Sequence, residues 1–241
     1  MSAATVPAAV VSYKRHRFPG ELISHAVWLS YRFLLSYRDV EELLAERGIA
    51  VTYETVRQWC RKFGQGFADG LRRRRPRPGD KWHCDEVQLK SNGRKHWLWR
   101  AVDQDGIVLD LLVQPRRHQE AAAAFLRRVV EGNGSQPRVV ITDTLARSPP
   151  ALRRVLPGVE HRRHTGLNNR AEHAHRPTRR RARVLQRFTS PAHAQHFLAP
   201  FGPISDHFGP RRHRLPAQQY HQTMQARFAT WREVTGLAAT A

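Results

Sequence analysis

Three acidic residues of this 241-residue chain, Asp85, Asp143 and Glu172, have the types and the order that metal-assisted phosphodiester chemistry needs. In-line attack on phosphorus is helped when both the attacking and the leaving oxygen are stabilised, and two Mg²⁺ ions about 3.5–4 Å apart can do this. Mg²⁺ prefers hard oxygen ligands and keeps several waters, so a few carboxylates are enough to hold it. The pattern predicts that Asp85 bridges two ions and that Asp143 and Glu172 each complete one of them.

The elements that must position these acids can be read from their neighbours. Asp85 lies in WHCDEVQL, a pattern typical of a strand, and Asp143 ends the apolar strand VVITD. Glu172 lies in LNNRAEH, which predicts the start of a helix. Strand alternation puts Glu86 on the face opposite to Asp85, but it does not say which face carries the site.

Each acid also has an ordinary structural explanation. Asp85 suits the surface of an edge strand, and Asp143 suits a turn after a strand. With Asn169 as N-cap, Glu172 is close to a capping box. Taken singly these explanations are as good as catalysis; the ordered set, in a strongly basic chain, favours catalysis.

The charge balance favours a nucleic acid as partner. The chain has 41 Lys and Arg against 20 Asp and Glu, a net charge of +21 and a pI near 11.5. A basic surface that serves only solubility rarely needs such an excess. No apolar run approaches the ~20 residues of a membrane-spanning helix, so no membrane partner is expected. Two distant cysteines, Cys60 and Cys84, suggest no disulfide framework, which fits a reducing cytoplasm.

Residues 20–70 predict an all-α helix-turn-helix domain after a disordered basic arm over residues 1–19. Apolar residues at helical spacing predict helices over 21–34, over 37–47, and from the N-cap Thr52 to about Phe63. Any small three-helix bundle shows such stripes, but the net charge favours DNA binding. The outer face of the third helix offers side chains that can read bases or hold phosphates: Tyr53, Glu54, Arg57, Gln58, Arg61 and Lys62.

A basic, proline-containing stretch over residues 71–80 predicts a linker, and residues 81–202 predict an α/β domain. Strands over 81–89, 95–103 and 107–113 form an antiparallel meander, with an Asn-Gly turn between the first two. A helix over 119–131 then leads to a strand over 138–142, most simply parallel to the first. This is the outline of an RNase H-like core, a mixed sheet with flanking helices. Residues 203–241 form a basic tail, helical from about Ala217, whose apolar stripe serves core packing or subunit contact.

Several arginines follow Glu172 at helical spacing and are candidates to hold DNA phosphates. Pro177 predicts a kink in that helix. The candidates are Arg176, Arg179, Arg180 and Arg183.

The segments WHCDEVQL, LWRAVDQDG, VVITD, PGVEHRRH, LNNRAEHAHRPTRRR and PRRHRLPA together resemble the DDE transposases of bacterial insertion sequences, most closely the insertion-sequence six family. The resemblance covers about residues 18–236. It implies a helix-turn-helix that binds terminal inverted repeats and an RNase H-like core that cuts and joins DNA with Mg²⁺, for which Mn²⁺ can substitute. It also implies the triad Asp85, Asp143 and Glu172, a DNA contact at Arg179, a homodimer or higher multimer on double-stranded donor and target DNA, and a bacterial, nucleoid-associated location.

The chain departs from the family pattern at several positions. Asp143 and Glu172 are separated by 28 residues (172 − 143 − 1), fewer than in many members. Thr144 stands where the family usually has lysine, and Thr165 replaces a second expected lysine. The alternative reading is therefore a decayed relic that acts only as a sequence-specific DNA-binding protein.

Overall fold

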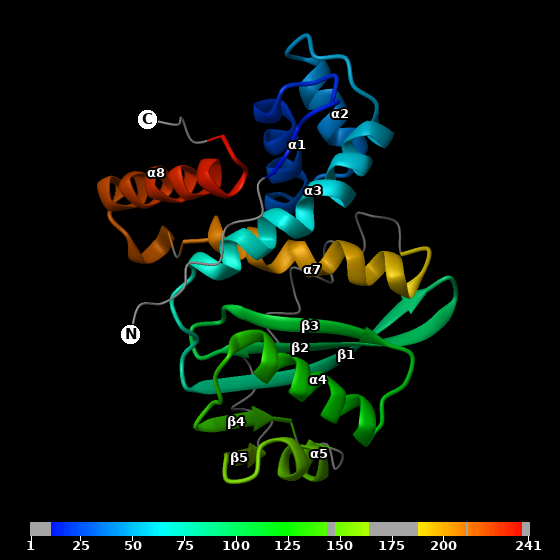
Figure 1. Cartoon of the computed structure of the whole chain (residues 1–241), viewed down its shortest axis with the longest axis vertical. Helices are drawn as coiled ribbons and strands as arrows, with labels where there is room; N and C mark the ends of the chain where they lie inside the picture. The colour runs from blue at the N-terminus through cyan, green and yellow to red at the C-terminus, as the bar shows by residue number, and fades with distance from the viewer. Residues whose placement is uncertain (1–10, 144–147, 164–187, 211, 238–241) are drawn as a thin grey trace. The chain divides into compact units, whose positions relative to one another are not determined.

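The computed structural model describes residues 11–143, 148–163, 188–210 and 212–237 (Figure 1). The chain divides into two compact units. One unit combines the N-terminal residues up to Arg75 with the C-terminal residues from Pro200, and the other runs from Pro76 to Ala199. Each unit is described by itself below.

The second unit is built on one five-stranded mixed sheet. Its strands are β1 (Lys81–Ser91), β2 (Arg94–Asp103), β3 (Val108–Gln114), β4 (Val139–Thr142) and β5 (Glu160–Arg163). Their order across the sheet is β3-β2-β1-β4-β5. The first three strands pair antiparallel, whereas β4 pairs parallel to β1 and β5 parallel to β4. This sheet, with its flanking helices, confirms the predicted RNase H-like fold.

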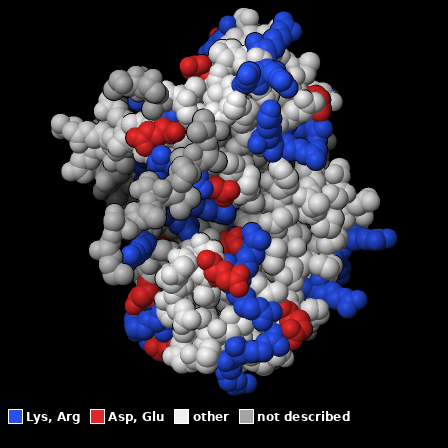
Figure 2. Space-filling model, in the orientation of Figure 1, with Lys and Arg blue, Asp and Glu red and all other residues white. Residues whose placement is uncertain are grey.

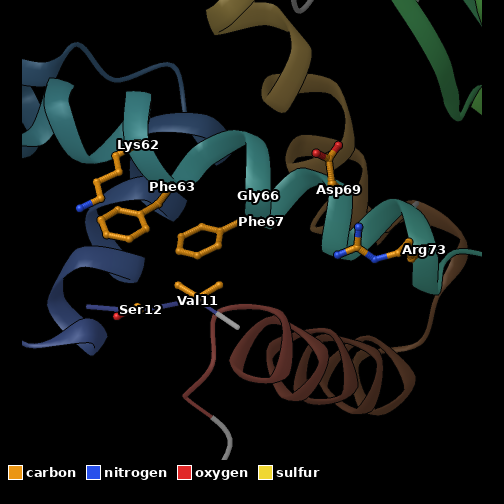
Figure 3. Close-up of a pocket in the computed structure, with 8 residues that line it drawn as sticks. All are labelled: Val11, Ser12, Lys62, Phe63, Gly66, Phe67, Asp69 and Arg73. Atoms are coloured by element: carbon orange, nitrogen blue, oxygen red, sulfur yellow. The ribbon is translucent and has the colours of Figure 1, made fainter. Parts of the chain in front are cut away.

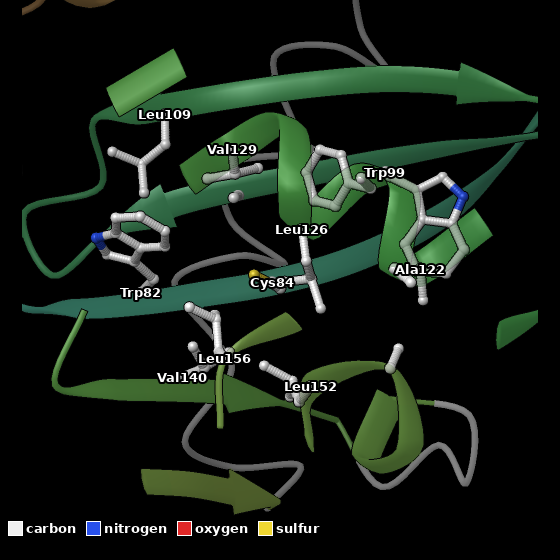
Figure 4. Packing of buried hydrophobic residues seen from close by; sticks show 14 of the residues in the cluster. Trp82, Cys84, Trp99, Leu109, Ala122, Leu126, Val129, Val140, Leu152 and Leu156 are labelled. Atoms are coloured by element: carbon white, nitrogen blue, oxygen red, sulfur yellow. The ribbon is translucent and has the colours of Figure 1, made fainter. Parts of the chain in front are cut away.

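Helices α4 (Gln119–Asn133) and α5 (Ser148–Val155) share a core with one face of this sheet (Figure 4). Trp82 and Cys84 of β1 belong to it, together with Trp99 of β2. α4 ends at Asn133, slightly beyond the predicted end at residue 131. It begins at the N-cap His118, whose Nδ1 accepts a hydrogen bond from the Ala121 amide at 3.0 Å. The core fixes which face of β1 points inward, and thereby which face remains for a site.

Three elements were not predicted. They are α5 and β5 of the second unit, and α7 (Pro191–His207), which begins in the second unit and ends in the first. β5 is the polar sequence EHRR, which carries no apolar alternation. α7 contains Pro200 and Pro203, which sequence reasoning takes as helix breakers. The first half of α7 belongs to the sheet unit, where the Gln195 side chain accepts from the Val113 amide at 2.8 Å.

The first unit is helical, with α1 (Gly20–Arg32), α2 (Tyr37–Ala45), α3 (Tyr53–Arg74) and α8 (Ala217–Val234). The prediction that the third helix ends near Phe63 was wrong. The stripe continues through the buried Phe67 and Leu71, and the Phe67 ring packs on Trp231 of α8 with centroids 5.2 Å apart. Residues 71–74, expected in the linker, are therefore part of α3.

The expectation of a disordered arm was also wrong for residues 11–19. The Tyr13 ring lies 5.2 Å from that of Phe63, and its hydroxyl donates to the Thr235 carbonyl at 2.7 Å. Phe18 packs edge-on against Trp59. Aromatic burial of this kind gives the segment enough contact to offset the entropy of ordering it. Within the described ranges, no helix is long and apolar enough to cross a membrane.

Candidate active site and DNA-binding surface

The strand register brings the first two predicted acids together. In the parallel ladder, Lys81 of β1 pairs with Val139 of β4, and His83 pairs with Ile141. Extended by two residues beyond these pairs, the same register sets Asp85 opposite Asp143, which directly follows the last residue of β4. Because side chains alternate with a period of two, both carboxylates share the face of His83 and Ile141.

That face is the one opposite to the α4 core. The buried residues Trp82 and Cys84 belong to the core. Asp85 follows Cys84 in β1, so alternation points its side chain to the opposite face. Directly across the antiparallel ladder from Asp85 lies Arg100, which is only 2% exposed. Because cross-strand partners share a face, Arg100 brings a buried positive charge to the face of the sheet that carries Asp85.

Glu86, the neighbour of Asp85, has a different environment. Its side chain is 7% exposed and forms an ion pair with Arg117, whose Nε lies 2.7 Å from Oε1. The Arg117 guanidinium in turn lies over the Trp97 ring, 4.5 Å from the centroid. Sequence reasoning missed this cluster, since nothing in the spacing of residues 86 and 117 signals the pairing.

The electrostatics of Glu86 report on the acids around it. Burial raises the pKa of Glu86 to about 7, the Arg117 partner opposes the shift, and the charges of Asp143 and Asp85 add to it. Burial also raises the pKa of the Cys84 thiol to about 12, with Glu86 and Asp85 reinforcing the effect. The charges of Asp143 and Asp85 thus both act on Glu86 and disfavour its ionised form.

The end of β4 is held by a short hydrogen-bond chain. The Thr142 hydroxyl donates to the Asp143 carbonyl at 3.0 Å and lies 2.9 Å from Nε2 of His161 on β5. The pKa of His161 is lowered by burial and by the nearby Arg163 and Arg153. A neutral imidazole can donate from Nε2 to the hydroxyl oxygen, which orients the chain segment that carries Asp143.

The third predicted acid, Glu172, lies outside the described residues. The same holds for Thr144, Thr165 and the arginine candidates Arg176, Arg179, Arg180 and Arg183. Within the described part of the chain, no group of three or more His, Cys, Asp or Glu residues could hold a metal ion. Asp85 and Asp143 are carboxylates, the hard-oxygen donor type that Mg²⁺ and Mn²⁺ accept.

Comparison with known proteins identifies the family. The family described as "DDE domain" matches residues 79–209. The chain is 31% identical over 172 residues to the transposase for insertion sequence-like element IS431mec of Staphylococcus aureus, covering 69% of this chain and 76% of that protein. The same values hold for the S. aureus transposase for insertion sequence element IS257 in transposon Tn4003. The chain is a DDE transposase. It belongs to the insertion-sequence six family, acts on DNA as a polynucleotidyl transferase, and uses divalent metal ions.

A viral intasome is among the solved structures that align with the transposase. A chain of the cryoEM structure of a simian T-cell lymphotropic virus intasome in complex with PP2A regulatory subunit B56 gamma aligns with a TM-score of 0.36 and 15% identity. The alignment covers 80% of this chain and 63% of that chain. A likeness at this level adds nothing to the fold assignment, which rests on the sheet order above.

The residues that are predicted to read DNA lie on α3 of the helical unit. Thr52 caps α3 by accepting from the Thr55 amide, and Gly48 takes a left-handed φ of 73° in the turn after α2. On the face drawn in Figure 2, Lys and Arg side chains predominate over Asp and Glu. The predicted reading residues are all exposed on α3: Tyr53, Arg57, Gln58, Arg61 and Lys62.

One of these residues is already engaged by an acid. Arg57 donates from Nε and Nη2 to the two carboxylate oxygens of Glu54, at 2.7 and 2.6 Å. Gln58 donates to the same carboxylate at 3.2 Å. Hydrogen bonds from Arg57 and Gln58 lower the pKa of Glu54 to about 2. Glu54 therefore binds the Nε and Nη2 donors of Arg57.

Proposed function

We propose that this transposase binds the terminal inverted repeats of its insertion sequence, nicks the DNA at those ends, and joins the freed 3′-hydroxyl to a target phosphodiester. The observation that supports the proposal is the parallel pairing of β1 with β4, whose register, extended by two residues beyond His83 and Ile141, sets Asp85 opposite Asp143. It supports a site in which two carboxylates from rigid strands act on one phosphate.

In this proposal Asp85, Asp143 and Glu172 hold Mg²⁺, with Mn²⁺ as a substitute. When bound, the ions stabilise the charge on the attacking and leaving oxygens. Asp85 is held within β1, and the Thr142–His161 hydrogen bond orients Asp143. Arg100 supplies a fixed positive charge across from Asp85. Strand-borne ligands of this kind keep their geometry when DNA arrives, which is what preorganised catalysis needs.

The DNA contacts are divided between two sets of residues. Tyr53, Arg57, Gln58, Arg61 and Lys62 read the element ends, because they form the exposed face of a capped helix after a turn. The arginines after Glu172, above all Arg179, hold phosphates near the cut. The transposase acts as a homodimer or higher multimer on paired ends, in the bacterial cytoplasm with the nucleoid.

The test is strand transfer by the purified protein on labelled DNA that carries the element ends. Asp85→Asn and Asp143→Asn should each lower product formation at least a hundredfold, since loss of groups that merely orient metal ligands already costs about 10–100-fold. EDTA should abolish the product. Asp80→Asn is the matched control, because Asp80 pairs with Arg138 at the surface of the same unit.

Binding to the ends without product in Mg²⁺ or Mn²⁺ would contradict the active enzyme. It would leave the DNA-binding relic, and lysine at positions 144 and 165 would be the first restorations to try. Product from Asp85→Asn equal to wild type would instead show that the acids are wrongly assigned.

A further inference from the structure

The tip of the β1–β2 hairpin carries three exposed cations. Lys90 and Lys95 are direct cross-strand partners, and Arg94 pairs with Ser91 next to the turn. All three cationic side chains are exposed. Like charges directly opposite each other on a sheet are destabilising, so the Lys90–Lys95 pair is unfavourable for the free protein.

Nothing in the described parts of the chain compensates these charges. Among the ion pairs there, none involves Lys90, Arg94 or Lys95, although acids pair with arginines elsewhere in the same unit, as at Asp80, Glu120 and Glu160. A tip that served only solubility would be expected to mix both signs of charge. A local excess of cations that costs stability is typical of a surface kept for a polyanion.

The tip is also held in one direction. Asn92 and Gly93 have φ angles of 47° and 74°, which is the type I′ geometry of a tight two-residue hairpin turn. The Ser91 hydroxyl, in a residue only 1% exposed, donates to the Phe188 carbonyl at 3.1 Å, and the Asn92 amide donates to the same oxygen at 3.3 Å. A fixed turn presents its cations without the entropic cost of ordering a loop on binding.

The position of the tip relative to the acids suits duplex DNA. β1 and β2 run on past the end of β4 before they turn (Figure 1). From Asp85 to Lys90 the strand advances five residues, roughly 17 Å at about 3.3 Å per residue. That is about five base-pair steps along a DNA strand at 3.4 Å each. Alternation puts Arg94 on the Asp85 face and the lysine pair on the other, so the tip offers cations on both faces.

We propose that this hairpin tip, formed by Lys90, Arg94 and Lys95, binds the sugar–phosphate backbone of duplex DNA whose cut strand lies at Asp85 and Asp143. The inference rests on the proposed function. It adds a sequence-independent contact that sets the path of the duplex beyond the cut, because lysine acts on phosphate as a point charge and carries no base information. The same chemistry fits the flank of the element end and the target duplex.

The test compares Lys90→Gln/Lys95→Gln with a control that removes two positive charges elsewhere in the unit, Arg127→Gln/Arg153→Gln. Arg127 on α4 and Arg153 on α5 are both exposed. Binding of full-length protein to duplex DNA is measured over a range of salt concentrations. The hairpin variant should lower the slope of log K against log salt by about 2, one unit for each lost phosphate contact. The control should keep the wild-type slope.

Two assays locate the DNA. A defect with uncut element ends assigns the contact to the donor flank. A defect of the hairpin variant that appears only with pre-cut ends, and that added target DNA relieves, assigns the hairpin contact to the target duplex. The melting temperature of the hairpin variant should stay unchanged or rise, because a like-charge pair is removed, so loss of folding does not explain a defect.

An unchanged salt slope in the hairpin variant would overturn the proposal, as would an equal change in the control. These outcomes are separable from failure of the proposed function. If wild-type protein binds DNA but forms no product, the enzymatic proposal fails while the salt slopes still decide the hairpin.

Discussion

At the scale of single residues, the Glu54–Arg57 pair on α3 controls what the reading surface offers to DNA. The Nε and Nη2 donors of Arg57, which form one bidentate edge of the guanidinium, are bound to Glu54. DNA must therefore displace Glu54 from this edge of the Arg57 guanidinium. Only an acceptor with matching geometry compensates for the lost ion pair. Glu54→Ala should raise the affinity for unrelated DNA several-fold. It should also reduce the ratio of the affinities for element-end DNA and unrelated DNA, since each bidentate base contact discriminates by about 1–3 kcal/mol.

The measurement is binding of the variant to end DNA and to scrambled DNA at fixed salt. Glu42→Ala on α2 is the control, because Glu42 is also exposed and the charge change is the same. An exposed ion pair contributes little to stability, so folding should persist in both variants. Equal gains in the two variants would mean that overall charge, rather than release of Arg57, sets the affinity.

Residue patterns in β1 show what the sequence could and could not decide at this scale. Alternation separates Asp85 from Glu86, and that separation could be predicted. Which of them faces outward depends on α4, whose packing against Trp82 and Cys84 is a contact between distant parts of the chain. The partner of Glu86, Arg117, lies 31 residues away and has no local signature. The face that Asp85 takes and the partner of Glu86 are therefore set by strand register and long-range pairing, which residue type does not reveal.

At the scale of elements, α3 shows tertiary packing overriding local preference. Its interior contains Gly64, Gly66 and Gly70, each unfavourable by up to about 1 kcal/mol relative to alanine in a helix. The predicted end near Phe63 lies just before these glycines. The helix continues because Phe67 and Leu71 are buried, a gain that outweighs the propensity cost.

The three glycines are not equivalent, which gives a matched pair of substitutions. Gly66 borders an open cavity of about 280 Å³ beside Phe63 and Phe67 (Figure 3), and an added Cβ there would meet no atom within 4 Å. Gly66→Ala should therefore stabilise the helical unit by about 0.5–1 kcal/mol. At Gly64 a Cβ would lie 2.8 Å from the buried Tyr31 ring, so Gly64→Ala should destabilise. Urea unfolding of both variants checks the opposite signs; two changes of the same sign would contradict the assigned packing.

At the scale of the whole molecule, the helical unit is assembled from both ends of the chain. Trp231 of α8 packs on Phe67 of α3 and on Phe208, and Arg74 pairs with Glu233 at 3.3 Å. The apolar stripe of the tail was visible in the sequence, and core packing was one of its two interpretations. Its partners on α3 were not visible, because Phe67 and Arg74 lie more than 150 residues earlier in the chain, and local periodicity carries no information about such contacts.

This arrangement predicts that a change in the tail weakens the DNA-reading helix. Trp231 is 4% exposed, and Trp231→Ala should cost about 3–5 kcal/mol in the helical unit. Hydrogen exchange should then show reduced protection in both α8 and α3, with the sheet of the other unit unchanged. Trp99→Ala is the reciprocal control, since Trp99 is 5% exposed in the sheet core and should loosen β1, β2 and α4 instead. If Trp231→Ala left α3 fully protected, the tail would be an appendage rather than part of the fold that holds α3. Trp231→Ala removes no base contact. If α3 is loosened as expected, weaker binding of element ends by this variant follows from the loss of packing between α8 and α3 alone.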